Sequence, residues 1–250
     1  MRVTWVIPCF NEAKRLDPSQ VESLVAESGV SVVLVDDGSK DETLSLLEAI
    51  AARSHGRVRA LGLPKNVGKA EAVRAGLRAA MPSADVVGYA DADFATPPHE
   101  LLRLTGEMRR RGVQAVLGSR VALAGRDIHR SPMRHYLGRA FGTVASWMLS
   151  VVIYDTQCGA KLFKVGPHLE AALDEPFGSR WVFDVELLGR LLAGAPGLAP
   201  LGSGDIVEVP LEAWKDVGGS KLKLSAMAKV PFELAQVARR LETRRRRALS

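Results

Sequence analysis

The sequence predicts an α/β protein built on a mostly parallel sheet. Through the first 120 residues, short runs rich in valine and other strand-forming residues alternate with segments whose apolar residues recur at helical spacing. Strands that alternate with short helices form βαβ units with right-handed crossovers. Each apolar run also ends in polar or charged residues, as expected where a parallel sheet binds ligands at the carboxyl ends of its strands.

The elements are expected in strict alternation. Pro8 ends the first strand, because proline has no N–H to donate to a sheet. Ser39 and Glu42 stand three residues apart ahead of a helical apolar pattern, which predicts a capping box and a helix start. Thr96 and Pro97 predict another helix start, with Thr96 as the N-cap. The expected strands are 2–8, 31–35, 57–63, 86–90 and 114–117. The expected helices include 18–28, an alanine-rich helix that follows the turn-rich link 64–69 and ends near Met81, 97–111 and 136–154.

Charge divides the chain into one domain, 1–220, and a basic tail, 221–250. From Trp214 onward, ten Lys or Arg residues face three acidic ones, a balance of +7, and the remainder carries −1. The tail keeps apolar residues at helical spacing, and Pro231 starts or kinks its second segment. A basic amphipathic helix is typical of membrane surfaces. For 244–250 alone, a solvated and frayed end is favoured. The apolar positions of the tail are Leu224, Met227, Leu234, Val237 and Leu241.

Composition excludes several classes of protein. No apolar run approaches the roughly 20 residues that span a bilayer, and the longest candidate, 144–153, carries two serines. Packing in the core is the default for the helix around it, and a surface for a polyprenyl chain is the alternative. No signal peptide is recognised, and Cys9 and Cys158 make neither a disulfide framework nor a metal cluster. We expect a cytoplasmic protein that rests peripherally on a membrane.

Asp91 and Asp93 follow the expected strand 86–90 directly. Two carboxylates at this spacing in a loop can bind one hard divalent cation and leave coordination positions for phosphate oxygens. Solvation of a loop is the alternative role for this pair. Polar residues at other strand ends favour the ligand site; they are Asn11, Glu12, Asp36, Asp37 and Arg120.

Two common phosphate-binding motifs are missing. The position of G-x-G-x-x-G after the first strand reads P-C-F-N-E, and no G-x-x-x-x-G-K-[ST] occurs. A metal at Asp91 and Asp93 is then one way to hold phosphate, while Glu12 and Asp37 remain for a base or ribose.

The order of motifs resembles a known family. V-I-P-x-F-N-E, V-D-D-G-S-x-D-x-T, N-x-G-K-A and A-D-A-D are similar to the inverting nucleotide-sugar glycosyltransferases of family 2, which have the Rossmann-like GT-A fold with helices on both faces of the sheet. In the second half, G-S-R, D-T-Q-C-G-A-K-L-F, R-W-V-F-D-V-E-L-L and G-G-S-K-L resemble dolichyl-phosphate β-glucosyltransferases. The related mannosyltransferases share this framework. The resemblance covers about residues 3–232.

The resemblance implies a role for each matching residue. The nucleotide pocket would be lined by Pro8, Asn11, Glu12 and Asp37, with Asp36 and Lys69 close by. Mg²⁺ or Mn²⁺ would be held by Asp91 and Asp93, of which Asp93 is assigned to catalysis. The acceptor phosphate would face Arg120 and Arg134, with Ser131 nearby. The sugar and acceptor side would be shaped by Asp155, Gln157 and the segment 180–186, which contains Arg180, Asp184 and Glu186.

The implied reaction moves a hexose, glucose from UDP-glucose, onto the phosphate of a polyprenyl phosphate. Because the second pKa of a phosphate monoester lies near ~6, the attacking oxygen is already deprotonated and no general base is needed. Ala95 stands where mannosyl members place a glutamine, which favours glucose.

Alternatives remain open at this point. They are a GDP-mannose donor, a soluble acceptor, and a non-enzymatic nucleotide-binding module. A nucleotidyltransferase that makes sugar nucleotides is disfavoured, because P-C-F-N-E lacks the Gly-rich basic loop such an enzyme needs.

Overall fold

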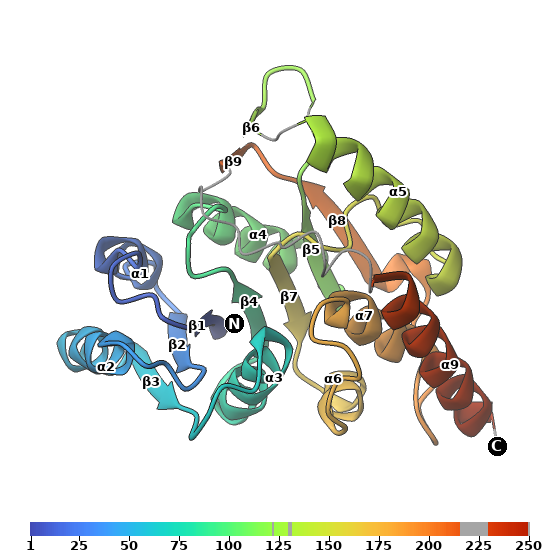
Figure 1. The fold of residues 1–250 in the computed structure, drawn as a ribbon, viewed down its shortest axis with the longest axis horizontal. Coiled ribbons are helices and arrows are strands. Elements are labelled where there is room, and N and C mark those ends of the chain that lie inside the picture. The colour runs from blue at the N-terminus through green and yellow to red at the C-terminus, as the bar shows by residue number, and fades with distance from the viewer. Residues whose placement is uncertain (122, 130–131, 216–229, 250) are drawn as a thin grey trace.

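A seven-stranded sheet organises the chain (Figure 1). The computed structural model describes residues 1–121, 123–129, 132–215 and 230–249. The strand order is β3-β2-β1-β4-β7-β5-β8, and β6 and β9 form a separate two-stranded ribbon. The sheet is parallel except at β7, which runs antiparallel to both β4 and β5. The predicted α/β fold with a mostly parallel sheet is confirmed.

The first half follows the expected alternation of strands and helices. Parallel pairing joins β2 to β3, and joins β1 to both β2 and β4. The elements are β1 Val3–Cys9, α1 Pro18–Val25, β2 Val30–Asp36, α2 Thr43–Arg53, β3 Val58–Gly62, α3 Lys69–Ala80 and β4 Val86–Ala90.

The second half adds the antiparallel strand β7, the strands beyond it and the remaining α-helices. Its elements are α4 Pro98–Arg111, β5 Ala115–Ser119, β6 Asp127–His129, α5 Pro132–Leu149, β7 Ala160–Lys164, α6 Pro167–Leu173, α7 Phe183–Ala193, β8 Ile206–Pro210, β9 Ala213–Lys215 and α9 Val230–Leu249. Helix α5 stops earlier than expected from the pattern, because Ser150 adopts a left-handed φ of 57° that a helix cannot continue.

Each face of the sheet carries its own apolar core. Side chains alternate along β1, so that Trp5 and Ile7 pack with α1, α2 and α4, whereas Val6 packs on the opposite side with α3. Residues of α5, α6, α7 and α9 belong to the same cluster as Val6. Helices therefore cover both faces, as the resemblance implied.

Two predicted helix starts were wrong. Helix α2 begins at Thr43 without a side-chain cap, and Ser39 instead accepts the N–H of Asn11 at 2.9 Å. Helix α4 begins at Pro98, one residue later than predicted, and Thr96 does not cap it. Pro97 is extended, with a ψ of 160°, because the residue before a proline is pushed away from the helical region.

The C-terminal helix α9 packs against the protein. Its apolar stripe, Leu234, Val237 and Leu241, is buried in the core cluster that contains α7. Gly189 on α7 makes this approach possible, since a Cβ there would lie 2.3 Å from Leu241 Cδ1. Arg244 donates to the carbonyl oxygens of Gly194 and Ala171 at 2.9 and 3.0 Å.

This packing corrects the frayed end expected for 244–250, because the helix continues to residue 249. The predicted boundary at 220/221 lies outside the described residues, as do Leu224 and Met227, and it stays a prediction. Within the described residues, no helix has both the length and the apolarity needed to cross a bilayer.

We expect Leu241→Ala to lower the free energy of unfolding by about 2–4 kcal/mol, because it removes buried contacts and leaves a cavity beside Gly189. Phe232 on the same helix is exposed, so Phe232→Ala is the matched control with an expected change below about 0.5 kcal/mol. Urea unfolding followed by circular dichroism measures both. Equally small effects would show that α9 does not contribute to the core.

Candidate active site

The carboxyl ends of β1, β2 and β4 bring polar residues to one edge of the sheet. Cys9 at the end of β1 pairs in register with Asp36 at the end of β2, so the loops that follow are neighbours. Asn11 joins them directly: its side-chain oxygen accepts the Lys40 N–H at 2.9 Å, and its own N–H binds Ser39. The strand-end residues predicted from the sequence therefore meet at this edge, as parallel topology requires.

Asp37 holds the loop before α3. Its two carboxylate oxygens accept the N–H groups of Val67 at 2.7 Å and Gly68 at 2.9 Å, and Asn66 Nδ2 donates at 2.9 Å. Burial raises the pKa of Asp37 against the effect of these bonds. Gly38 is required beside it, because its φ is 64° and a Cβ would lie 2.4 Å from Lys65. A base or ribose that binds Asp37 has to share these acceptors.

Asp91 lies against a lysine at the start of α3. The Lys69 ammonium forms an ion pair with the Asp91 carboxylate. Burial lowers the pKa of Lys69, but the carboxylates of Asp91, Asp184 and Asp93 outweigh it and raise the pKa overall. Gly159 gives Asp91 its space, since a Cβ there would lie 2.1 Å from Asp91 Oδ2.

Asp93 completes the acidic pair. Burial and the negative charge of Asp91 raise the pKa of Asp93, so a cation at this place would relieve both effects. The Phe94 N–H donates to the Asp91 carbonyl at 3.1 Å, and the Ala95 N–H donates to Asp93 Oδ1 at 3.1 Å, which shape the turn. Hard oxygen donors of this kind fit Mg²⁺ or Mn²⁺. Among the described residues, no third His, Cys, Asp or Glu joins them, so the other ligands would come from substrate or water.

Arg120 is already paired with a carboxylate. Its Nε and Nη2 atoms bind both oxygens of Asp155 at 2.7 and 2.8 Å, and its guanidinium lies over the Trp214 ring at 5.4 Å. Glu208 fixes Asp155 from behind by accepting the N–H groups of Tyr154 and Asp155 at 2.7 and 2.6 Å. The two residues predicted for the acceptor side are thus in contact, and an acceptor phosphate would compete with Asp155 for Arg120.

A buried charge network lies under the site, and the sequence reasoning missed its lysine. Lys161 on β7 is fully buried and donates to Asp184 Oδ1 at 2.9 Å and to the Cys158 carbonyl. The Tyr89 hydroxyl donates to the same Asp184 oxygen. Burial and the charge of Asp184 raise the pKa of Tyr89 well above its usual range. A lysine inside an apolar strand was the available signal, since buried lysines require a partner.

Glu186 has a different task from the substrate contact expected of it. Its side chain is buried and accepts the Gly178 N–H at 2.8 Å and an Arg190 N–H at 2.8 Å. Arg240 Nη1, on α9, lies 3.5 Å from Glu186 Oε1. Glu186 therefore links the segment before α7 to α9.

Some of the remaining predicted site residues lie in the part of the chain that the structure describes, and others lie outside it. Arg180 is exposed and lies beside the loop that Asp37 holds, because a Cβ on Gly68 would be 3.2 Å from Arg180 Cδ. Glu12, Pro8 and Gln157 are half-buried, each in or next to a loop at this edge. Ser131 and the side chain of Arg134 lie outside the described residues.

Comparison with known proteins identifies the family. Residues 4–166 match the family model described as Glycosyl transferase family 2. A dolichyl-phosphate beta-glucosyltransferase of Trichomonas vaginalis is 33% identical over 252 residues, which cover 94% of this chain and 70% of that protein. The human dolichyl-phosphate beta-glucosyltransferase is 32% identical over 238 residues, with 87% and 68% covered.

Solved structures share the fold. Glucosyl-3-phosphoglycerate synthase from Mycobacterium tuberculosis, in complex with Mn²⁺, UDP and glucosyl-3-phosphoglycerate, has a TM-score of 0.64 at 20% identity and covers 95% of this chain and 80% of its own. A Pyrobaculum calidifontis mannosyltransferase with GDP-Man and Mn²⁺ has a TM-score of 0.59 at 16% identity, with 94% and 62% covered. These likenesses confirm the GT-A-like fold. The acidic edge and the family match agree, and the chain belongs to glycosyltransferase family 2, related to dolichyl-phosphate β-glucosyltransferases at about 30% identity.

Proposed function

We propose that this protein transfers glucose from UDP-glucose to the phosphate of a polyprenyl phosphate, with inversion and with Mg²⁺ or Mn²⁺. The observation that carries the proposal is the charged edge after β4, where Asp91, Asp93 and Lys69 lie together. The relatives at about 30% identity, which are dolichyl-phosphate glucosyltransferases, support the choice of donor and acceptor.

The donor diphosphate is expected at this charged edge. Asp91 and Asp93 would hold the cation, which offsets the negative charge that develops on the departing diphosphate. Lys69 lies at the first position of α3, where the helix N-terminus also favours an anion. If Asp91 bound the cation, the Lys69 ammonium that now pairs with it would be free to bind a diphosphate oxygen. Arg180 and the loop held by Asp37 would border the nucleotide.

The acceptor arrives with its nucleophile already charged. A phosphate monoester is mostly dianionic at neutral pH, so the site has to position it rather than deprotonate it. Arg120 suits this task because a planar guanidinium binds phosphate bidentately. Asp155 holds Arg120 in place in the free protein. The oxygens of the acceptor phosphate would displace it. Since a polyprenyl phosphate resides in a bilayer, the protein would work at a membrane surface.

A panel of nucleotide sugars tests the donor and the acceptor. Purified protein is incubated with UDP-glucose, UDP-GlcNAc or GDP-mannose, with Mn²⁺ or Mg²⁺, and with a short polyprenyl phosphate or 3-phosphoglycerate. We expect glucosyl polyprenyl phosphate from UDP-glucose, and no turnover after the metal is removed with EDTA. Transfer of mannose, or transfer to 3-phosphoglycerate alone, would contradict the proposal.

Asp93→Asn is expected to lower kcat by at least about a hundredfold, because an amide is a poor ligand for a hard cation. The matched control is Asp85→Asn, which removes a carboxylate from the residue just before β4, where Asp85 pairs with Arg2. The control is expected to keep the rate of the wild type. Titration of Mn²⁺ by electron paramagnetic resonance gives an independent measure of the lost ligand. Full activity of Asp93→Asn would remove the basis of the proposal.

Arg120→Lys is expected to raise KM for the acceptor about tenfold to a hundredfold and to leave KM for the donor unchanged, because lysine cannot bind phosphate bidentately. Arg126→Lys, which alters an arginine paired with Glu212, is the control. Initial rates measured over both substrate concentrations separate the two constants. A rise in the donor KM alone would place Arg120 on the other side of the site.

A further inference from the structure

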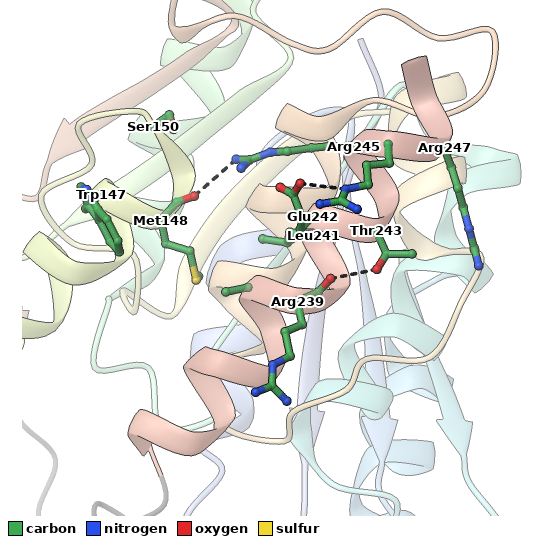
Figure 2. A pocket seen from close by; sticks show the side chains of 11 residues that line it. Trp147, Met148, Ser150, Arg239, Leu241, Glu242, Thr243, Arg245 and Arg247 are labelled. Carbon is green, nitrogen blue, oxygen red and sulfur yellow. Dashed lines mark hydrogen bonds and ion pairs between the residues drawn. The ribbon is translucent and has the colours of Figure 1, made fainter. Parts of the chain in front are cut away.

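A second surface with its own chemistry lies between the end of α5 and the outer face of α9. An open groove of about 1010 Å³ separates these two helices (Figure 2). Trp147 and Met148 line it from α5, and the arginines Arg239, Arg245, Arg246 and Arg247 line it from α9. The transfer reaction proposed above uses none of these residues.

The α5 side of the groove exposes large apolar side chains to solvent. Trp147 is 84% exposed and Val152, just beyond the helix, is 93% exposed. Val144 lies three residues before Trp147 and therefore on the same helical face, and it is also exposed. Trp5 and Trp214, by contrast, are buried. An exposed tryptophan with an exposed valine on the same helical face marks a contact surface, because exposed apolar area is unfavourable in water.

The α9 side carries a surplus of positive charge. The helix holds six arginines and two glutamates, and its arginines divide into two groups. Arg240 and Arg244 turn inward, toward Glu186 and toward backbone carbonyls. The other four line the groove; among the described residues that line it, the one acidic side chain is Glu242, which pairs with Arg246 at 3.0 Å.

A hydrogen bond joins the two halves of the groove. Arg245 Nη2 donates to the carbonyl oxygen of Met148, in the last turn of α5, at 3.3 Å (Figure 2). A cation at a helix C-terminus is favourable, because it meets carbonyl groups that have no partner within the helix. This hydrogen bond keeps the exposed apolar residues of α5 beside the arginines of α9, so the two groups form one surface.

We propose that this surface docks on an anionic lipid bilayer. Trp147 and Val152 enter the interface between headgroups and acyl chains, where tryptophan is most favourable, and the groove arginines contact lipid phosphates. Charge complementarity selects this occupant. A second copy of the chain packed symmetrically on the same surface would set one arginine cluster against the other.

The proposal also changes which apolar residues meet lipid. The stripe of α9 that the sequence assigned to a membrane surface, Leu234, Val237 and Leu241, is buried against the protein. The apolar contribution comes instead from α5, and α9 supplies the charge. The inference rests on the proposed function only because a lipid acceptor would require the enzyme to reach a membrane. Vesicle binding itself can be measured without turnover.

Vesicle sedimentation of the full chain tests the surface. We expect binding to vesicles of phosphatidylcholine and phosphatidylglycerol, weak binding to phosphatidylcholine alone, and release by salt. The double variant Arg246→Gln/Arg247→Gln is expected to bind about 30-fold more weakly, since each basic residue near an anionic surface contributes about 1 kcal/mol. Trp147→Ala is expected to lose at least about tenfold.

Helix α4 provides the matched control. Arg110→Gln/Arg111→Gln removes two exposed arginines from the end of a helix on the opposite face of the sheet. Its vesicle affinity is expected to stay within about twofold of the wild type, because these charges point away from the docked membrane. An equal loss in this control would mean that only net charge matters, and the proposal would fail.

Fluorescence identifies the residue that enters the bilayer. Lipids brominated on their acyl chains are expected to quench the tryptophan emission of the wild type and to lose most of this effect in Trp147→Phe. Absence of quenching, or equal binding to neutral vesicles, would overturn the proposal. So would a concentration-dependent dimer that Trp147→Ala dissolves, because a second copy would then cover the surface.

Transfer to a water-soluble short-chain polyprenyl phosphate separates this inference from the proposed function. The groove variants are expected to keep the wild-type rate in this assay, which needs no vesicle. A protein that binds vesicles through Trp147 but transfers no sugar would overturn the proposed function and still support the docking surface.

Discussion

The ion pair between Lys69 and Asp91 is the interaction on which the site depends. Parallel topology directs the loops after β1, β2 and β4 to one edge, and this convergence crowds carboxylates together. Burial and the negative charge of Asp91 raise the pKa of Asp93, which shows that this edge is crowded with negative charge. Lys69 offsets that charge within the protein. A divalent cation would replace Lys69 beside the aspartates, and a diphosphate would replace the carboxylate beside Lys69.

Local sequence patterns predicted the strands and helices near this edge well. They did not predict which strands pair or which side chains are in contact. The strand 86–90 and its two aspartates were placed correctly, because a buried run followed by acids is visible in a short window. The antiparallel insertion of β7, which puts Lys161 under Asp184, joins segments far apart in the chain. No local period encodes such a pairing. Ser39 likewise matched a capping box in sequence, yet its hydroxyl binds Asn11 instead.

The C-terminal helix shows a different limit of sequence reasoning. An amphipathic pattern states that one face of a helix avoids water, and it does not state whether protein or lipid covers that face. In α9 the answer comes from α7, where Gly189 leaves room for Leu241. The inward turn of Arg240 and Arg244 follows from the same packing, because these residues flank the buried stripe. The arginines left outside are then the ones that can serve another partner.

The positive side chains of the site and those of the groove differ in how far carboxylates of the protein compensate their charge. Around the sheet edge, Lys69 and Arg120 each have a carboxylate partner within the protein, so an anion that binds either of them would have to replace that partner. At Lys69, exchange favours a ligand that brings its own compensating charge, as a metal-bound diphosphate does, and at Arg120 an acceptor phosphate would replace the negative charge of Asp155. The described residues that line the groove include four arginines and one glutamate, and this positive balance would attract an anionic surface. Under the proposed function, exchange at the edge would select the substrates, and attraction at the groove would bring the enzyme to a membrane.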